Sequence, residues 1–256
     1  MEPQMSKPCR KHHLLSFFFL FFISLCNIHL AKAQDTPLPF FATYPNLDLS
    51  TWYISNGWSN GEHQACEWRA GAVDAYYRNL RITVSDQGGA IRPYGCGEIQ
   101  SRQRFGYGRF EARLRAAAGS GLNTAFFTYI GPPMGVAEHD EIDFEFLGKD
   151  PTVVELNYWV NGKQQPSYKH NLGFDATRDF HIYAFEWRPT SIKWFVDGIL
   201  VHETPPNVPI PKQPGKLFFS LWSGTQIEDD WMGKFVYTSP VSAMFSWARY
   251  RYYNLQ

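Results

Sequence analysis

Ionisable side chains alternate along the segment 139–145, where His139, Glu141, Asp143 and Glu145 are each separated by one residue. Successive side chains of a β-strand point to opposite faces, so these four would share one face. The opposite face would be mostly apolar and would carry Asp140, Ile142, Phe144 and Phe146. Carboxylates crowded on one face repel each other and raise each other's pKa values. The row therefore indicates a chemical task, although an amphipathic strand with a solvated acidic face would give the same alternation.

Cleavage of a glycosidic bond needs such a set of carboxyl groups. One acts as nucleophile or base, and a second, kept protonated, acts as general acid. The two lie ~5–5.5 Å apart in retaining enzymes and ~6.5–9.5 Å apart in inverting ones. In an ideal strand the Cα atoms of Glu141 and Glu145 are ~13 Å apart, so their side chains must lean together to reach the retaining distance. Asp143 lies between them, where it can orient one glutamate and influence the titration of both.

The sequence of residues 140–148, DEIDFEFLG, resembles the active-site strand of glycoside hydrolase family 16. The similarity extends over about residues 52–253 and is greatest to the bacterial lichenases (endo-1,3-1,4-β-glucanases) and the rhizobial succinoglycan glycanases. This resemblance implies that Glu141 is the nucleophile, Asp143 an assisting acid and Glu145 the acid/base, with net retention. We expect the neighbouring carboxylates to raise the pKa of Glu145, so that it is protonated before it acts.

Residues that would contact the substrate follow from strand faces and from the same resemblance. Glu155, Asn157 and Trp159 would share one face of a strand, and Phe127 and Tyr129 one face of another, although core packing is the alternative for Phe127. The expected substrate-binding residues are Trp58, Asn60, Glu98, Gln100, Phe127, Tyr129, His139, Glu155, Asn157, Trp159, Trp222 and Trp231.

Several of these positions depart from the lichenase pattern. His139 stands where lichenases have Trp, and a His at this position resembles the pattern of the plant xyloglucan endotransglucosylase/hydrolases. Gln100 replaces an Arg, Trp159 a Tyr and Glu155 a Gln. These changes leave the three acids intact, so they bear on linkage and decoration of the substrate rather than on the reaction. Ser246 stands where lichenases have an Asp that helps to hold a structural calcium ion, which leaves backbone oxygens for that ion. We predict no metal site and no cofactor beyond this.

Residues 1–33 have the pattern of a secretory signal peptide. A positive start precedes a short apolar run at 14–25, and Ala31-Lys32-Ala33 is a small-x-small cleavage site. The run is shorter than the ~20 residues of a membrane-spanning helix. We therefore predict a soluble protein that is secreted, extracellular or periplasmic, and that has no membrane partner.

Residues 34–256 would form a single catalytic domain, the size of one β-sandwich or barrel. Removing residues 1–33 takes away four basic residues and one acidic residue, so 20 Lys and Arg remain against 23 Asp and Glu, a formal charge of −3. This balance argues against nucleic acid, whose binding needs clustered positive charge. A polysaccharide is the expected partner and a monomer the expected state.

Two cysteines, Cys66 and Cys96, remain after the predicted cleavage. In an oxidising compartment such a pair is a disulfide candidate. Closing the loop between them would stabilise the fold by ~3.5 kcal/mol in the chain-entropy model. The lichenase pattern also has cysteines in matching contexts.

Short strands with turn signals follow one another from residue 80 onward, without long helical periodicity. Asn161-Gly162 and Asp197-Gly198 are typical of hairpin turns, and 205–214 is a proline-rich loop. We predict an all-β sandwich of two antiparallel sheets. The resemblance implies a concanavalin-A-like jelly roll with a concave substrate cleft. The expected strands are 81–84, 107–115, 124–130, 153–160, 181–187, 192–196, 216–221 and 243–252.

Four functions remain open at this point. The first is an endo-acting retaining hydrolase of mixed-linkage 1,3-1,4-β-glucan or a related β-glycan. The second is a xyloglucan or β-glucan transglycosylase; the plant enzymes usually carry an Asn-x-Ser/Thr sequon after the motif, which is absent here. The third is a 1,3-β-glucanase, whose relatives usually insert one residue before the last Glu. The fourth is a non-catalytic lectin on the same fold, which would not need a crowded carboxylate row.

Overall fold

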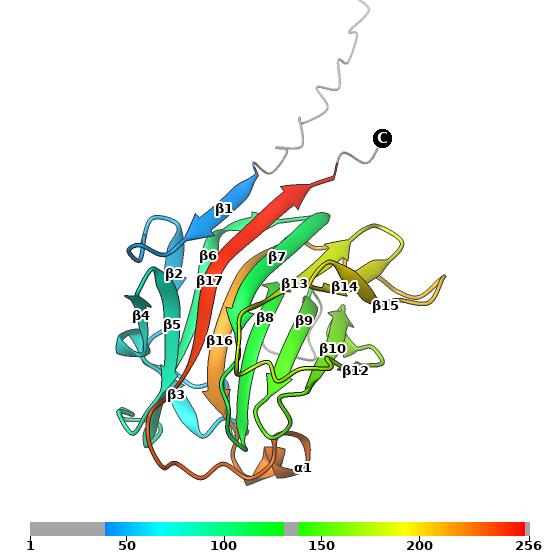
Figure 1. Cartoon of the computed structure of the whole chain (residues 1–256). Coiled ribbons are helices and arrows are strands. Elements are labelled where there is room, and N and C mark those ends of the chain that lie inside the picture. Colours follow the sequence, from blue (N-terminus) through cyan, green and yellow to red (C-terminus); the bar gives the residue numbers. More distant parts are fainter. Residues whose placement is uncertain (1–38, 131–137, 254–256) are drawn as a thin grey trace, which may run out of the picture. The chain divides into compact units, whose positions relative to one another are not determined.

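The computed structural model describes residues 39–130 and 138–253, and most of these residues are in β-strands of two sheets (Figure 1). The predicted signal peptide lies outside the described residues. No helix among the described residues is long and apolar enough to cross a membrane.

The larger sheet has nine strands and carries the acidic segment near its middle. In spatial order it contains β11 (Lys163–Gln164), β10 (Val153–Val160), β9 (Asp140–Leu147), β8 (Leu122–Ile130), β16 (Gly215–Ser223), β6 (Tyr94–Phe105) and β2 (Trp52–Ile54), while β12 (Tyr168–Asn171) pairs with β10 and β3 (Cys66–Trp68) with β6. All pairs are antiparallel except β3 with β6, where the two chains run parallel and the predicted disulfide joins Cys66 to Cys96.

The smaller sheet has eight strands. They are β15 (Ile199–Glu203), β14 (Ile192–Val196), β13 (His181–Trp187), β7 (Gly108–Arg115), β17 (Val241–Tyr252), β5 (Asn79–Val84) and β4 (Val73–Tyr76), with β1 (Phe40–Thr43) paired to β17. Helical structure in the described ranges is limited to single turns at η1 (Ala70–Ala72), η2 (Gln226–Glu228) and α1 (Asp229–Met232). The predicted all-β jelly-roll sandwich is confirmed. Residues 204–214 form the connection between β15 and β16, as their prolines predict.

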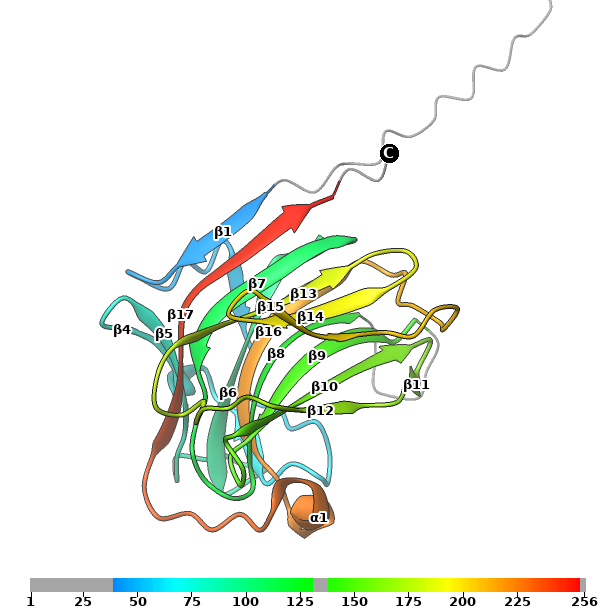
Figure 2. The same ribbon diagram turned by 45° about the vertical axis from the view of Figure 1, so that its right-hand side comes forward.

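The two sheets lie one over the other (Figure 2), and the core between them is built from alternate, apolar side chains of both. Aromatic rings meet across it, as in Phe126 with Phe185 at 5.4 Å and Phe219 with Phe245 at 4.6 Å between centroids. Such pairs add ~0.5–1.5 kcal/mol each beyond the area that they bury. The apolar face of β9 takes part through Phe144, which is fully buried and packs against Tyr183. Burial of one face fixes the pleat, so that the other face of β9 must present the acids.

The predicted hairpin turns form as expected. Asn161 and Gly162, between β10 and β11, and Asp197 and Gly198, between β14 and β15, all have positive φ angles between 48° and 83°. Positive φ at both central residues is the requirement of a type I′ turn, which asparagine, aspartate and glycine satisfy at low steric cost.

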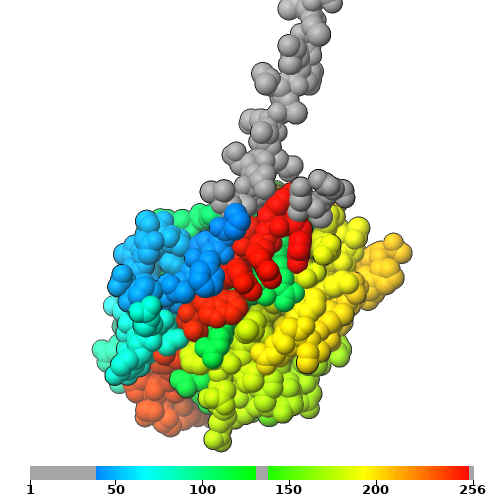
Figure 3. All heavy atoms as spheres, turned by 45° about the horizontal axis from the view of Figure 1, so that its top comes forward, coloured from blue at the N-terminus to red at the C-terminus, as the bar shows by residue number. Residues whose placement is uncertain are grey.

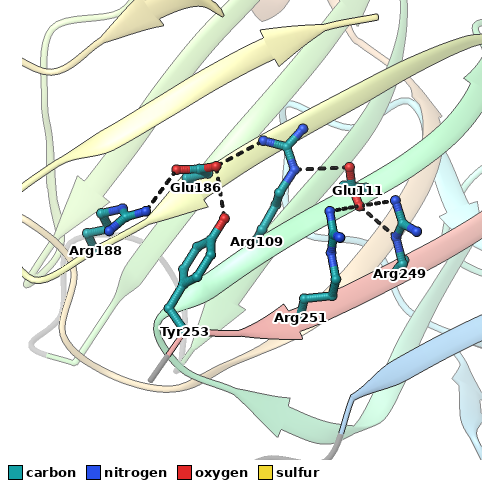
Figure 4. A network of polar contacts seen from close by, with 7 residues as sticks. All are labelled: Arg109, Glu111, Glu186, Arg188, Arg249, Arg251 and Tyr253. Atoms are coloured by element: carbon teal, nitrogen blue, oxygen red, sulfur yellow. Dashed lines mark hydrogen bonds and ion pairs between the residues drawn. The ribbon is translucent and has the colours of Figure 1, made fainter. Parts of the chain in front are cut away.

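Paired charges lie on the outer face of the eight-stranded sheet (Figure 4). We call this group of residues the outer arginine network. Figure 3 looks onto this side, where the red β17 runs between the blue β1 and the yellow segment of β14 and β15. The network joins Arg109, Glu111, Glu186, Arg188, Arg249, Arg251 and Tyr253.

Candidate active site

Three rows of paired residues cross the acidic face of β9 without a register shift. Glu141 pairs with Tyr129 of β8 and Trp159 of β10, and Asp143 pairs with Phe127 and Asn157. Glu145 pairs with Ala125 and Glu155 in the third row. We call this side of the nine-stranded sheet the carboxylate face.

The same rows continue onto β16, β6 and β2. Phe218, Gln100 and Tyr53 extend the Asp143 row, and Ser220 and Glu98 extend the Glu145 row. Ser220 and Ala125 are thus the small side chains between two carboxyl groups, Glu98 and Glu145.

Many side chains of the carboxylate face are largely withdrawn from solvent, although they do not point into the core. Asp143 and Asn157 are 4% exposed, and Glu155 is 8% exposed. Glu141 is more accessible, with 17% of its side chain exposed. Burial of so many polar groups on an outward face is typical of a recessed binding surface.

Glu145 has the environment of a general acid. Burial, together with the charges of Glu141 and Glu155, raises its pKa to about 8, although hydrogen bonds from Asn123 and Asn157 favour the charged form. The Asn123 amide donates to Oε1 at 2.9 Å and the Asn157 amide donates to Oε2 at 2.6 Å. The upward direction of this pKa shift agrees with the prediction, but its main cause is different. Burial dominates, and the second carboxylate that acts on Glu145 is Glu155 of the next strand rather than Asp143.

Asp143 forms a hydrogen bond with Glu141. The pKa of Asp143 is raised well above its usual range by burial, by the charges of Glu141 and Glu145, and by a hydrogen bond with Glu141. A protonated Asp143 therefore donates to the Glu141 carboxylate. Since Asn157 belongs to the Asp143 row, its bond to Glu145 brings one oxygen of that glutamate toward the same row. Glu145 thus directs Oε2 toward Asn157, the cross-strand neighbour of Asp143.

His139 also holds Glu141 by a hydrogen bond. Its Nε2 lies 2.6 Å from Oε2 of Glu141, and because a carboxylate only accepts hydrogen bonds, the imidazole N–H donates. Its ring stacks on Trp159 at 5.0 Å and meets Tyr129 edge-on at 5.1 Å. The side chain has no exposed surface. His139 was predicted to contact the substrate, whereas in this structure its side chain is fully buried against Glu141, Tyr129 and Trp159.

Glu98 is a fourth perturbed carboxyl group on this face. Burial raises its pKa to about 7, the Ser55 hydroxyl lowers it by donating a hydrogen bond, and the charge of Glu141 raises it. The carboxylate face therefore holds three carboxyl groups, those of Glu98, Asp143 and Glu145, with raised pKa values.

Aromatic residues stand at two ends of the face. Trp231 of α1 donates its indole N–H to Glu155 at 3.0 Å and lies 6.2 Å from Trp222 of β16. Trp58 stacks on Tyr53 at 6.4 Å beside Gln100 at the other edge. The side-chain oxygen of Asn60 accepts a hydrogen bond from the indole of Trp68 in β3, and its contact with substrate stays a prediction.

Some contributors were missed from the sequence. Asn123 follows the same alternation as Phe127 and Tyr129, so its place on the face could have been read, but its bond to Glu145 depends on register. Asp140, which the pattern places on the apolar face, is buried there because backbone N–H groups of Asn161, Lys212 and Gln213 bind its two oxygens. It fixes the start of β9 against two loops.

Ser246, on β17, offers no carboxylate to the calcium ion that the resemblance implies. Within residues 39–130 and 138–253, no group of three or more His, Cys, Asp and Glu side chains could hold a metal ion. No step below is routed through a metal.

Comparison with known proteins agrees with this geometry. Residues 60–242 match the family model of Glycosyl hydrolases family 16. The chain is 40% identical over 231 residues to a beta-glucanase of Bacillus amyloliquefaciens, covering 90% of this chain and 94% of that protein. It is 45% identical over 197 residues to the endo-1,3-1,4-beta-glycanase ExoK of Rhizobium meliloti strain 1021, covering 77% and 72%.

A solved structure has the same fold. The beta-glucanase of Bacillus licheniformis superimposes with a TM-score of 0.78 at 39% identity, covering 85% of this chain and all of that one. The matched family and the relatives place the chain among the glycosidases. This chain belongs to glycosyl hydrolase family 16.

Proposed function

We propose that the protein is a secreted, endo-acting hydrolase that cuts mixed-linkage 1,3-1,4-β-glucan or a closely related β-glycan with retention of configuration. The observation that carries this proposal is the position of Glu141, Asp143 and Glu145 at alternate residues of β9 on the carboxylate face. Burial there raises the pKa of Glu145 to about 8. The names of relatives at 40% and 45% identity support the substrate class.

In the first step the protonated Glu145 gives its proton to the leaving glycosidic oxygen, while Glu141 attacks the anomeric carbon. The carbon–oxygen bond to the leaving sugar breaks as the bond to Glu141 forms. In the second step Glu145, now a carboxylate, takes a proton from water, and this water displaces Glu141. At the end Glu145 is protonated again and Glu141 is again a carboxylate.

The neighbours of the two glutamates serve these steps. Asp143 and His139 donate hydrogen bonds to Glu141 and fix its direction. Asn123 and Asn157 each have an amide oxygen without a hydrogen-bond partner among the described residues. A half-turn of either amide presents that oxygen instead of the NH₂ group. The same pair can therefore hold Glu145 in both its protonated and its ionised form.

The rings of Trp58, Phe127, Tyr129, Trp159, Trp222 and Trp231 would stack against sugar units along the face. Secretion remains part of the proposal. The Cys66–Cys96 disulfide supports it, because such bonds persist in oxidising compartments. Sequencing the N-terminus of the exported protein tests it, with Gln34 as the expected first residue.

The substrate is tested by incubating the protein separately with mixed-linkage β-glucan, laminarin, xyloglucan and succinoglycan. Reducing ends, product size and, by NMR, the anomeric configuration of the first product are followed. Rapid shortening of mixed-linkage glucan with retained configuration is the expected result. Transfer to an added xyloglucan oligosaccharide would favour the transglycosylase alternative, whose plant members His139 brings to mind by its position. Binding without cleavage would favour the lectin.

A further inference from the structure

Three cations stand together on the carboxylate face without an acidic partner. They are Arg102 and Arg104 of β6 and Lys216 of β16, and we call them the cation cluster. None of them takes part in an ion pair within residues 39–130 and 138–253. Like charges placed together destabilise a fold unless something compensates them.

A register shift in the β6–β16 pair brings the cluster together. Phe218 pairs with Gln100, but Lys216 pairs with Arg104, so β6 advances four residues where β16 advances two. The extra residues of β6 let Arg102 and Arg104 approach Lys216. Bulges of this kind commonly re-aim side chains next to functional sites.

Neutral groups hold each cation in place and leave further donors available. Arg102 donates from Nε to the carbonyl of Leu49 at 2.8 Å, and Lys216 donates to Oε1 of Gln100 at 2.7 Å. Arg104 donates from Nη1 to the carbonyl of Pro214 at 3.3 Å. These bonds orient the three groups but do not neutralise their charge.

The charge of the cluster is felt within it. Burial, followed by the charges of Arg104 and Arg102, lowers the pKa of Lys216. The arginines of the outer arginine network contrast with this, because each of them meets a glutamate. An uncompensated cluster on the face that binds substrate indicates that the missing charge comes with a ligand.

The cluster lies where a bound glycan would pass. Lys216 pairs with Tyr129, which pairs with Glu141, so Lys216 is two strands, or ~10 Å, from the predicted nucleophile. Arg102 lies 5.9 Å from the ring centre of Tyr53, which stacks on Trp58. The strands β2, β6 and β16 that carry these residues are neighbours in the sheet (Figure 1). A sugar ring on the aromatic pair would therefore present its substituents to the cations.

We propose that Arg102, Arg104 and Lys216 form a subsite for a carboxylate carried by a sugar unit of the glycan, on the β6 side of the unit that Glu141 attacks. Arginine and lysine bind carboxylates through short, charge-assisted hydrogen bonds, and arginine adds a planar fork that fits both oxygens. This inference rests on the proposed function for the position of the chain. It extends the substrate class from neutral β-glucan to β-glycans with acidic units.

The test uses one polymer in two forms, mixed-linkage β-glucan and the same preparation with a fraction of its primary alcohols oxidised to carboxylates. The wild-type enzyme is compared with the triple variant Arg102→Gln, Arg104→Gln, Lys216→Gln and with the three single variants. Arg115→Gln is the control, because Arg115 lies on β7 in the other sheet. The ratio of kcat/KM on the oxidised polymer to kcat/KM on the neutral polymer is measured at low and high salt.

In the triple variant we expect this ratio to fall ~10-fold or more at low salt, and by less at high salt, since charge-assisted bonds are lost and salt screens them. The single variants should each give part of the fall, and Arg115→Gln none. Equal losses on both polymers, or the same fall with Arg115→Gln, would overturn the subsite. If neither polymer is cut, the proposed function fails. Binding of the oxidised polymer by wild-type and triple variant in affinity electrophoresis then decides the subsite alone.

Discussion

The carboxylate face and the outer arginine network hold acids of similar burial with opposite consequences. Glu111 is 4% exposed, but Arg109 and Arg249 outweigh its burial and lower its pKa. Asp143 is also 4% exposed, and with only carboxyl groups acting on its charge its pKa is raised. The pKa values of Glu111 and Asp143 shift in opposite directions because their charged partners differ, since the two residues are equally buried. One sheet uses buried charge to hold strands together, and the other leaves Asp143 and Glu145 without a cation partner among the residues that the structure describes.

Unpaired polar atoms follow the same division. Of the seven buried side-chain atoms without a hydrogen-bond partner in the described ranges, four belong to Asn123, His139, Asp143 and Asn157 around the acids. None belongs to the outer arginine network. An unsatisfied buried polar group costs ~1–3 kcal/mol, so stability alone does not explain this concentration.

The largest expected effect is on the reaction itself. Glu141→Gln should lower kcat on mixed-linkage glucan at least ~10⁴-fold, because the amide cannot form the glycosyl-enzyme. The melting temperature should change little, since Glu141 is one of the more accessible acids of the face. Reducing-end assays and thermal unfolding of the same preparation check both. A variant that kept a tenth of the activity would remove Glu141 as nucleophile.

The matching change in the other region should act on stability instead. Glu111→Ala leaves Arg109, Arg249 and Arg251 without their shared carboxylate. Removing one partner of a buried ion pair typically costs ~3–5 kcal/mol. Urea unfolding measures this cost, and kcat of the folded enzyme at 25 °C should remain near that of the wild type. Glu203→Ala, which removes an exposed pair with Lys193, is the control and should cost at most ~1 kcal/mol. A loss below that value for Glu111→Ala would contradict the contrast.

The pH dependence of stability should have opposite signs in the two regions. The pKa of Glu145 is raised to about 8, so the folded state holds its proton more tightly than the unfolded chain, and stability is lost as pH rises toward 8. Glu145→Gln keeps the neutral form at every pH. At pH 8–9 it should therefore unfold at a temperature higher by ~2–4 °C, which corresponds to ~1 kcal/mol after allowance for partial solvent access. Near pH 4.5 the difference should disappear.

Glu111→Gln is the counterpart, because the pKa of Glu111 is lowered. It should destabilise at neutral pH, and its effect should shrink as the pH falls through the folded-state pKa of Glu111. Melting curves of both variants from pH 3 to 9 would show two slopes of opposite sign. Slopes of the same sign would mean that the folded structure does not raise the pKa of Glu145.

The sequence was informative where local pattern decides the outcome. Strict alternation placed Glu141, Asp143 and Glu145 on one face, and Asn161-Gly162 and Asp197-Gly198 marked two hairpins. Partners that come from other strands could not be read in this way. Arg251 and Glu111 are 140 residues apart in the chain, and Glu155 reaches the surroundings of Glu145 only through the β9–β10 register. The cation cluster depends on a register shift that no local signal marked.

The smallest effect tests whether the outer arginine network is a structural unit to its edge. Tyr253 donates its hydroxyl to Oε1 of Glu186 at 2.8 Å, the oxygen that Arg109 also binds. Tyr253→Phe should destabilise by ~1 kcal/mol, the usual net value of one such bond. Tyr252→Phe, one residue earlier, is the matched control and should change stability by less than half of that. Activity should be the same in both variants, because Glu186 lies on the opposite sheet from Glu141. A fall in kcat without a fall in stability would mean that the two sheets are coupled and that the division of labour between them is incomplete.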